Sequence, residues 1–381
     1  MRIAVDARWM LNPAGGAFAG IPHYVDGVVR ALLKEGGNHT FVLFVRDNIP
    51  QTVLDRLRSL HPTVDIRIEP YRRGSLWNNH FGFAKRVRET KADVLFAPAG
   101  QLPLGFRDKA VVTLHDFAIY RHPEWFPDRG LGRFFSMCVV VPWTMQRASG
   151  FISVSEFTKR EAMDLFRISE KKIRIIPPVV EPSANISPLT QETWERFGLP
   201  GKYFLMVGTI EPRKNMAFAV QAFDRLLETV DDPDFRLAIV GKRGWKYEPT
   251  IAEIARVNRK WQERGRGEVV RELGYVTAEE KWALISGAQA LLFPSLYEGF
   301  GIPVAEALSI GTRVISTLPF DVSSFENVVF QQTGLTDEGR FSAALREALD
   351  SVRTSPFPSE NKFSSQEVAG QILEALENVT N

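Results

Sequence analysis

The chain has 381 residues, of which 44% are hydrophobic and 24% are charged. This length is typical of more than one domain, because single hydrophobic cores rarely grow beyond about 250–300 residues, and the composition excludes an intrinsically disordered chain. The 47 Lys and Arg residues nearly balance the 45 Asp and Glu residues, so a formal net charge of +2 excludes binding to nucleic acid through overall charge, and we expect no such partner.

The first half of the chain alternates short apolar segments with helical patterns. Continuous apolar segments rich in β-branched residues are typical of strands that are covered on both faces. We expect strands at residues 2–7, 41–46, 65–69, 93–98, 110–116, 150–155 and 173–178.

The pattern starts again after a Pro- and Ser-bearing stretch, with strands expected at residues 203–208, 236–241, 269–274, 290–295 and 313–318. Two successive series of this kind predict an α/β protein with two doubly wound parallel sheets. We place the first domain at 1–180, a linker at 181–202 and the second domain at 203–360. The segment 361–381 is expected to be a helix, with packing back on the first domain as one option.

Two cations follow the first strand of the second half. Arg213 and Lys214 lie between Gly208, where that strand ends, and a helix expected to begin near Asn215. Backbone N–H groups at a helix amino end carry partial positive charge, so cations there would complete an anion site. The alternative is that Asn215 caps the helix while both cations are solvated.

The sequence YEGFGIPVAEALSIG, residues 297–311, combines two glutamates with a helix start. Pro303 is suited to open a helix, which places Glu298 in the preceding loop and Glu306 in the first turn. Gly299 and Gly301 allow backbone amides to approach a ligand closely. A carboxylate beside a phosphate site is favourable where it accepts hydrogen bonds from hydroxyl groups, which indicates a nucleotide sugar.

These motifs, together with VGTIEPRKN, LGYVTAEEKWALISGAQALLFPS, VVTLHD and ISVSEFTKREA, resemble the family 4 retaining glycosyltransferases of the GT-B fold. The resemblance covers nearly the whole chain in the same order. It implies two Rossmann-like domains that face a cleft, with the acceptor bound on the side of the first domain and the nucleotide sugar by the second.

The resemblance also implies roles for individual residues. Glu298 would hold hydroxyls of the transferred sugar and Glu306 those of the ribose, while Arg213 and Lys214 would hold the diphosphate and stabilise the leaving group. His115 would reach the transferred sugar. The remaining donor-binding candidates are Gly20, Gly274, Tyr275, Val276, Gly299, Phe300, Gly301 and Ile302.

One departure from the family concerns the loop before the first helix. The chain has Gly20, Ile21, Pro22, His23 and Tyr24 where the family commonly has Gly-Ile-Gly-Arg-Tyr. Because Pro22 lacks an N–H group, this loop has one amide fewer with which to bind phosphate.

The expected activity is retaining transfer of a hexose, with GDP-mannose as the leading donor, to a saccharide or lipid-linked saccharide acceptor in polysaccharide or lipopolysaccharide biosynthesis. Alternatives are a UDP- or dTDP-sugar donor, or a nucleotide-sugar epimerase or phosphorylase of the same fold. A non-catalytic nucleotide-sugar-binding protein is the least favoured. We expect no cofactor and no obligatory metal, because the one Asp-x-Asp pattern, at 231–234, falls in an apparent turn.

The chain starts directly with a strand-like segment and contains no apolar run of about 18 residues, so we expect a cytoplasmic protein. Residues 71–83 mix arginines with Trp77 and Phe81 and are the candidate for peripheral contact with the inner face of the membrane. Residues 131–148 are also apolar, but we expect them to form a buried helix in which Cys138 is a structural thiol.

Overall fold

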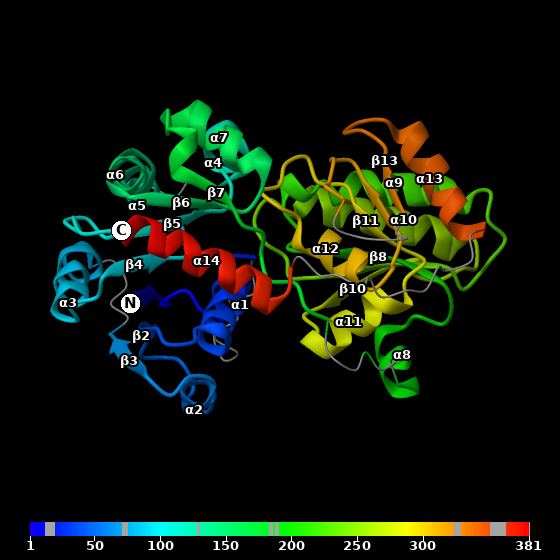
Figure 1. Ribbon diagram of the computed structural model, residues 1–381. Helices are drawn as coiled ribbons and strands as arrows, with labels where there is room; N and C mark the ends of the chain where they lie inside the picture. The colour runs from blue at the N-terminus through cyan, green and yellow to red at the C-terminus, as the bar shows by residue number, and fades with distance from the viewer. Residues whose placement is uncertain are drawn as a thin grey trace. The chain divides into compact units, whose positions relative to one another are not determined.

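The computed structural model describes residues 1–11, 20–70, 75–127, 130–182, 186, 190–323, 329–350 and 363–380. It divides into two compact units, each with its own parallel sheet (Figure 1). Unit 1 comprises Met1–Phe117, Asp128–Val180 and Lys362–Asn381, and unit 2 comprises Ala118–Pro127 and Glu181–Asn361.

The sheet of unit 1 has seven strands in the order β3-β2-β1-β4-β5-β6-β7, all in parallel pairs. Strands β4, β5 and β6 are buried throughout and β1 is buried after Arg2, which explains their continuous apolar sequences. The strands are β1 (Arg2–Asp6), β2 (Thr40–Arg46), β3 (Val64–Glu69), β4 (Val94–Ala97), β5 (Ala110–Leu114), β6 (Gly150–Ser153) and β7 (Ile173–Ile175).

The sheet of unit 2 has six strands in the order β10-β9-β8-β11-β12-β13. Both strand orders reverse direction once, as in a doubly wound fold, so the predicted fold class is confirmed. The strands are β8 (Tyr203–Val207), β9 (Arg236–Val240), β10 (Val270–Gly274), β11 (Ala290–Phe293), β12 (Val314–Ser316) and β13 (Phe330–Gln332).

The helices cover the sheets. Those of unit 1 are α1 (Gly20–Glu35), α2 (Gln51–Leu60), α3 (Phe83–Glu89), α5 (Gly130–Phe135), α6 (Val141–Arg147), α7 (Glu156–Phe166) and α14 (Ser365–Thr380), with π-helical turns η1 (Trp77–Gly82) and η3 (Ser136–Val140) and the 3₁₀ turn η4 (Glu170–Lys172). Those of unit 2 are α4 (Ala118–Arg121), α8 (Gln191–Phe197), α9 (Met216–Leu227), α10 (Glu248–Glu263), α11 (Ala278–Gly287), α12 (Ile302–Ser309) and α13 (Glu338–Asp350), with the 3₁₀ turns η2 (Pro123–Trp125) and η5 (Pro212–Lys214).

Helix α14 belongs to unit 1, although it follows unit 2 in the sequence. It lies beside α1 on one face of the sheet and contacts β4, β5 and β6 (Figure 1). Its residues Val368, Ile372 and Leu376 are completely buried, and the backbone N–H of Val180 donates to the carbonyl of Phe363 over 2.9 Å. The helix therefore supplies part of the core of unit 1.

Two local expectations for unit 1 are wrong. The segment 131–148 is not one buried helix: it forms α5, η3 and α6, and Leu131, Phe134 and Val139 are exposed. Cys138 is exposed too, rather than a buried thiol. A π-helical turn has more residues per turn than an α-helix, so it shifts the side chains that follow it around the axis and carries apolar ones to the surface.

The segment expected as a linker, 181–202, contains helix α8, whose cap Thr190 accepts a hydrogen bond from the Thr193 backbone N–H. The structure describes only part of this segment, and the described part lies in unit 2.

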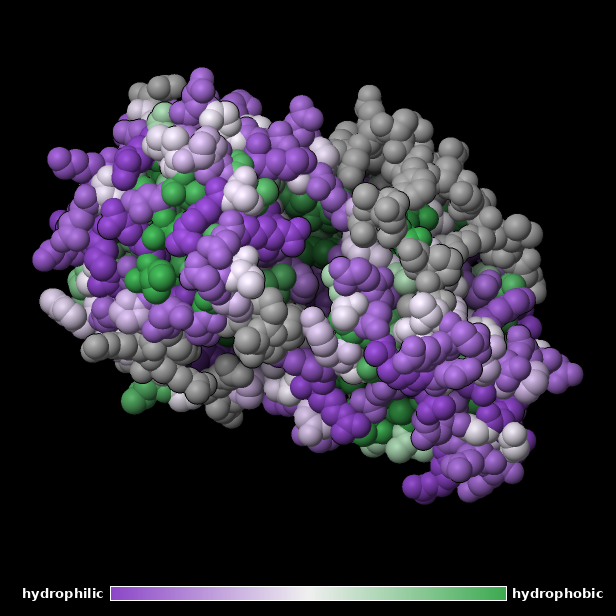
Figure 2. All heavy atoms as spheres, turned by 90° about the horizontal axis from the view of Figure 1, so that it is seen from below, coloured by the Kyte–Doolittle hydropathy of each residue, from purple (hydrophilic) through white to green (hydrophobic). Residues whose placement is uncertain are grey.

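No helix among the described residues is long and apolar enough to span a membrane. Figure 2 shows one face of the molecule, on which hydrophilic residues predominate and hydrophobic ones lie in small groups.

Candidate active site

The loops that carry the predicted donor residues are neighbours because their strands are neighbours. Strand β8 pairs with β11 in parallel, so the loops that follow both strands leave the same edge of the sheet. The backbone N–H of Leu296 donates to the carbonyl of Arg213 over 2.9 Å and links the two loops directly. Residues 84 or 85 positions apart in the sequence are thereby brought into contact.

The side chains of these loops form a compact ionic cluster. Arg213 Nη1 donates to Glu298 Oε2 over 2.7 Å, and Lys214 Nζ donates to Glu298 Oε1 over 2.5 Å. Arg213 also donates to Glu211 Oε1 through Nη2 over 2.8 Å and to the carbonyl of Tyr297 over 3.2 Å. Three of the four predicted catalytic residues therefore contact one another.

The cluster shifts the ionisation of both of its carboxyl groups. Burial alone raises the pKa of Glu298, but the charges of Arg213 and Lys214 outweigh it and lower the pKa to about 2. Glu211 is buried, and this burial raises its pKa in spite of the same two cations. Glu298 is thus the carboxylate that the cations hold in its charged form.

The backbone around the cations is specialised. Pro212 begins the 3₁₀ turn η5, and Asn215 adopts a left-handed conformation with φ of 49° before α9 begins at Met216. The side chain of Asn215 makes no capping hydrogen bond, so the alternative in which Asn215 caps the helix while both cations are solvated is wrong. The tight turn instead directs Arg213 and Lys214 toward Glu298.

Helix α12 follows the second loop and carries Glu306. Gly301 precedes the helix with a φ of 96°, a conformation that favours glycine, and Pro303 lies in the first turn. Glu306 lies in the second turn, not the first as expected, because the helix begins at Ile302. Glu306 is 7% exposed, and its carboxylate forms an ion pair with Lys281 of α11.

Sequence reasoning missed Lys281 and gave Glu211 no role. Lys281 lies one turn into α11, which is started by a capping box between Thr277 and Glu280. Its neighbour Trp282 is buried, so no local pattern distinguishes Lys281 from an ordinary surface lysine. Only the packing of α11 beside α12 reveals that it meets Glu306.

The candidates for contact with the nucleobase follow strand β10. Gly274 ends the strand with a φ of 68°, and its carbonyl accepts from the Gly241 backbone N–H over 2.9 Å. Tyr275 is 63% exposed, whereas Val276 is buried. Because β10 is separated from β8 by β9 alone, these residues lie at the same sheet edge as the ionic cluster. Gly299, Phe300 and Ile302 lie in the loop and helix start after β11.

The remaining predicted residues lie in unit 1. His115 directly follows β5, and its Nε2 contacts the carbonyl of Pro98 over 2.6 Å. A carbonyl only accepts, so Nε2 carries the proton and Nδ1 is the acceptor. Burial lowers the pKa of His115, which keeps the ring neutral near pH 7. The Tyr24 ring packs edge-on at 4.7 Å.

Gly20 is the first residue of α1, and a Cβ added there would meet nothing within 4 Å. The other glycines of the loop before it fall within 12–19, outside the described residues. At the start of α7, Ser155 caps the helix by accepting from the Thr158 N–H. Thr158 Oγ1 instead donates to the carbonyl of His115 over 3.2 Å.

A short segment that follows β5 belongs to unit 2, which the sequence did not indicate. Trp245 Nε1 donates to the carbonyl of Trp125 over 2.9 Å, and its ring stacks on Phe126 at 5.7 Å. His122 stacks on Trp125 at 3.9 Å and meets the Tyr297 ring edge-on at 6.1 Å. We call residues 118–127 the strap, and it contacts the residue beside Glu298.

The described residues contain no group of three or more His, Cys, Asp or Glu side chains that could hold a metal ion. The site consists of two cations, carboxylates and a helix start. Such an arrangement can bind an anionic leaving group and accept hydrogen bonds from hydroxyls.

Comparison with known proteins agrees with this chemistry. The family model described as glycosyl transferases group 1 matches residues 194–366, and the model described as Glycosyltransferase Family 4 matches residues 18–184. O-antigen chain mannosyltransferase B of Escherichia coli is 30% identical over 277 residues, which are 70% of this chain and 67% of that protein.

Serotype-specific mannosyltransferase WbdA of Escherichia coli is 27% identical over 250 residues, 63% of this chain but only 29% of that protein. Among solved structures, Anabaena HepE in complex with UDP and glucose has a TM-score of 0.60 at 15% identity, covering 99% of this chain and 100% of HepE. At that identity the likeness supports the fold alone. The chain therefore belongs to the group 1 and family 4 glycosyltransferases, and its two parallel-sheet units are those of the GT-B fold.

Proposed function

We propose that the protein transfers mannose from GDP-mannose, with retention of the anomeric configuration, to a saccharide acceptor in the synthesis of an O-antigen or related polysaccharide. The observation that carries the proposal is the ionic cluster of Arg213, Lys214 and Glu298 beside α12. The choice of mannose and of the polysaccharide is supported by the mannosyltransferase relatives.

In the proposed complex the diphosphate takes over the hydrogen bonds that Arg213 and Lys214 donate to Glu298. Glu298 then accepts hydrogen bonds from hydroxyls of the mannose, and Glu306 accepts those of the ribose. In the free protein Arg213 and Lys214 lower the pKa of Glu298 to about 2, so the residue is a carboxylate, ready to accept hydrogen bonds, when the donor arrives.

The reaction step breaks the bond between the anomeric carbon and the β-phosphate oxygen and forms one to the acceptor oxygen on the same face. The acceptor proton goes to the departing phosphate. Charge therefore grows on the leaving GDP, where Arg213 and Lys214 stabilise it. Neutral His115 is proposed to contact the transferred sugar.

The direct test is incubation of the protein with GDP-mannose and a mannose-containing oligosaccharide, followed by NMR of the product. An α-linked mannose added to the acceptor supports the proposal. An altered sugar released from donor alone would indicate an epimerase, and a reaction that requires inorganic phosphate would indicate a phosphorylase; either result would contradict it. Transfer from UDP- or dTDP-sugars in preference to GDP-mannose would overturn the donor assignment.

Binding of the nucleotide gives a separate prediction. We expect GDP at 100 times its Kd to stabilise the folded protein by about 2.7 kcal/mol, and UDP and dTDP to have smaller effects at equal concentration. The measurement is a thermal-shift series with the three nucleotides. Glu306→Ala should reduce the shift with GDP, whereas Glu279→Ala, at an exposed glutamate of α11, should not. An unchanged shift in Glu306→Ala would contradict the role of Glu306.

A further inference from the structure

Glu211 is a buried carboxyl group to which the proposed reaction gives no role. It directly precedes the 3₁₀ turn η5, it is 4% exposed, and its backbone carbonyl accepts from the Lys214 N–H over 3.0 Å. A carboxyl group that is removed from water is unfavourable unless it is paired. Arg213 is the partner, and it donates to Glu211 Oε1 through Nε over 3.1 Å and through Nη2 over 2.8 Å. Two nitrogens of Arg213 are therefore held by a group outside the proposed substrate contacts.

The loop that follows β9 covers Glu211. The Ile210 N–H donates to the carbonyl of Lys242 over 2.9 Å, and the Gly244 N–H donates to the carbonyl of Ile210 over 3.0 Å. A Cβ added at Gly244 would lie 2.5 Å from Thr209 Cγ2 and 3.8 Å from Glu211 Cβ, so glycine is needed for the loop to come this close. The backbone that carries Glu211 is therefore anchored, which a group that holds another side chain in place requires.

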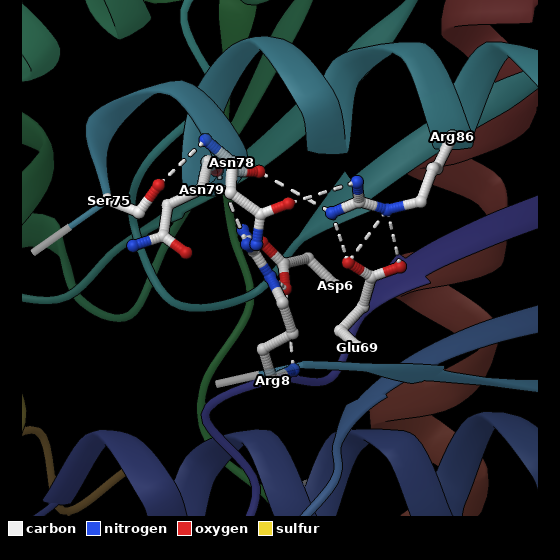
Figure 3. A network of polar contacts seen from close by, with 7 residues as sticks. All are labelled: Asp6, Arg8, Glu69, Ser75, Asn78, Asn79 and Arg86. Carbon is white, nitrogen blue, oxygen red and sulfur yellow. Dashed lines mark hydrogen bonds and ion pairs between the residues drawn. The ribbon is translucent and has the colours of Figure 1, made fainter. Parts of the chain in front are cut away.

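Unit 1 contains an acidic residue and an arginine with the same spacing, and there the effect of the pair is visible (Figure 3). Asp6 ends β1 and is 3% exposed, and Arg8 donates to it through Nε over 2.7 Å and through Nη2 over 2.8 Å. The remaining nitrogen, Nη1, donates to the carbonyl of Asn79 over 3.3 Å, and the guanidinium lies 3.5 Å from the centre of the Phe83 ring. The acidic residue thus orients the arginine so that Nη1 reaches a turn 71 residues away in the sequence.

The pair in unit 2 has the same geometry but a different target. Arg213 binds its acidic partner through Nε and Nη2, as Arg8 does, and both arginine side chains are 17% exposed. Nη1 of Arg213, however, donates to Glu298 Oε2 over 2.7 Å and to the carbonyl of Tyr297 over 3.2 Å. Arg8 is held by groups that keep their places, whereas Arg213 faces a carboxylate that is proposed to accept from sugar hydroxyls once the donor is bound.

Donor binding would therefore remove one side-chain partner of Arg213. An arginine side chain that loses a partner gains rotamers, and it must give up that freedom again to bind phosphate. Glu211 keeps the plane of the guanidinium oriented through this exchange. Burial raises the pKa of Glu211, whereas the pKa of Glu298 is lowered, so Glu211 is better suited to accept hydrogen bonds than to supply negative charge.

We propose that Glu211 is a positioning residue, which fixes the guanidinium of Arg213 so that Nη1 faces the diphosphate of the donor. It touches neither the substrate nor the reacting atoms and acts only through Arg213. This inference rests on the proposed function, because it assigns the diphosphate to Arg213. The two glutamates of the cluster then differ in their roles: Glu298 accepts from the sugar, and Glu211 orients the cation.

The test compares two replacements of similar size. Glu211→Met removes the acceptor oxygen and is expected to lower the kcat for transfer, from the donor that the wild type uses, by about 10- to 100-fold, with a change in KM below about threefold. Glu211→Gln keeps an acceptor oxygen, so its kcat should stay within about fivefold of the wild type. Glu253→Met is the matched control: it breaks a pair with Arg256 on α10 and should leave kcat unchanged.

A double variant shows whether Glu211 acts through Arg213. Arg213→Met alone should lower kcat by about 10²–10³-fold, and adding Glu211→Met to it should change kcat by less than about twofold. A residue that merely stabilised the fold would lower the activity by the same factor in both backgrounds. Urea unfolding shows whether each variant is folded, and the comparison of Glu211→Gln with Glu211→Met does not depend on Arg213→Met.

The wild-type protein separates failure of this inference from failure of the proposed function. A wild type that transfers no sugar from a nucleotide donor overturns the proposed function, and this inference with it. With an active wild type, three results overturn the inference alone: Glu211→Met keeps a kcat within about twofold, Glu211→Gln is as impaired as Glu211→Met, or the losses of the two single variants multiply in the double variant.

Discussion

Replacing Lys214 with alanine is expected to lower the kcat for mannosyl transfer by about 10²–10³-fold, with a smaller change in KM. Lys214 donates to Glu298 over 2.5 Å and is the last residue of the 3₁₀ turn η5, which is proposed to hold the diphosphate. Negative charge on the leaving group grows during the reaction, so a positive charge at this point stabilises the transition state more than the bound substrate.

The measurement is steady-state kinetics with GDP-mannose, with chemical denaturation as a check that the variant is folded. Lys202→Ala is the matched control, because Lys202 is an exposed lysine of unit 2 just before β8. Lys214→Arg should recover part of the activity, since it keeps the charge while changing its geometry. A kcat of Lys214→Ala within about twofold of the wild type would remove Lys214 from the catalytic site.

The second prediction concerns stability. Glu298→Gln should lower the free energy of unfolding by about 3 kcal/mol at pH 7, an order-of-magnitude value that follows from a pKa lowered from 4.5 to about 2. Burial alone would favour the protonated form, but Arg213 and Lys214 favour the carboxylate more strongly. A neutral amide forfeits that attraction and leaves both cations with less negative charge beside them.

The pH dependence gives the sign of the effect. The pKa of Glu298 is lower in the folded protein than in the unfolded chain, so the unfolded chain takes up a proton first as the solution is acidified. The stabilisation is complete above about pH 4.5 and is lost as the pH falls toward 2. Urea unfolding of wild type and Glu298→Gln between pH 3 and 7 should show a difference that narrows with acidity. A constant difference would instead attribute the loss to hydrogen bonding.

Most of the architecture could be predicted from the sequence, because strands buried on both faces must be continuous apolar segments. All twelve predicted strands are present. Strand β13 could not be predicted: it has three residues, FQQ, none of them fully buried, and it pairs only at the sheet edge. Helix α8 was overlooked because prolines and serines around it indicated a linker.

The sequence motifs indicated which residues belong to the candidate site but not which of them contact one another. The motif with Arg213 and Lys214 and the motif with Glu298 each indicated an anion or a sugar, yet their mutual ion pairs arise from the pairing of β8 with β11. The same holds for Lys281, whose partner lies on another helix. The strap is held by a hydrogen bond from Trp245, which lies more than a hundred residues further along the chain, and no local sequence pattern predicts such a contact.

For the apolar segment 131–148, the prediction from the sequence was wrong. Its hydrophobicity favoured burial, and the π-helical turn η3 altered the spacing on which that expectation depended. The number of apolar residues in the segment therefore did not predict which of their side chains are buried in the core.

The placement of α14 has a consequence for the order in which the protein matures during synthesis. Unit 2 has all its segments once residue 361 has emerged from the ribosome, whereas unit 1 still lacks the helix that packs on α1 and on β4 to β6. The usual order, in which the amino-terminal domain folds first, is therefore reversed at the final step. The nascent first half must keep an apolar face unfilled while some 180 further residues are translated.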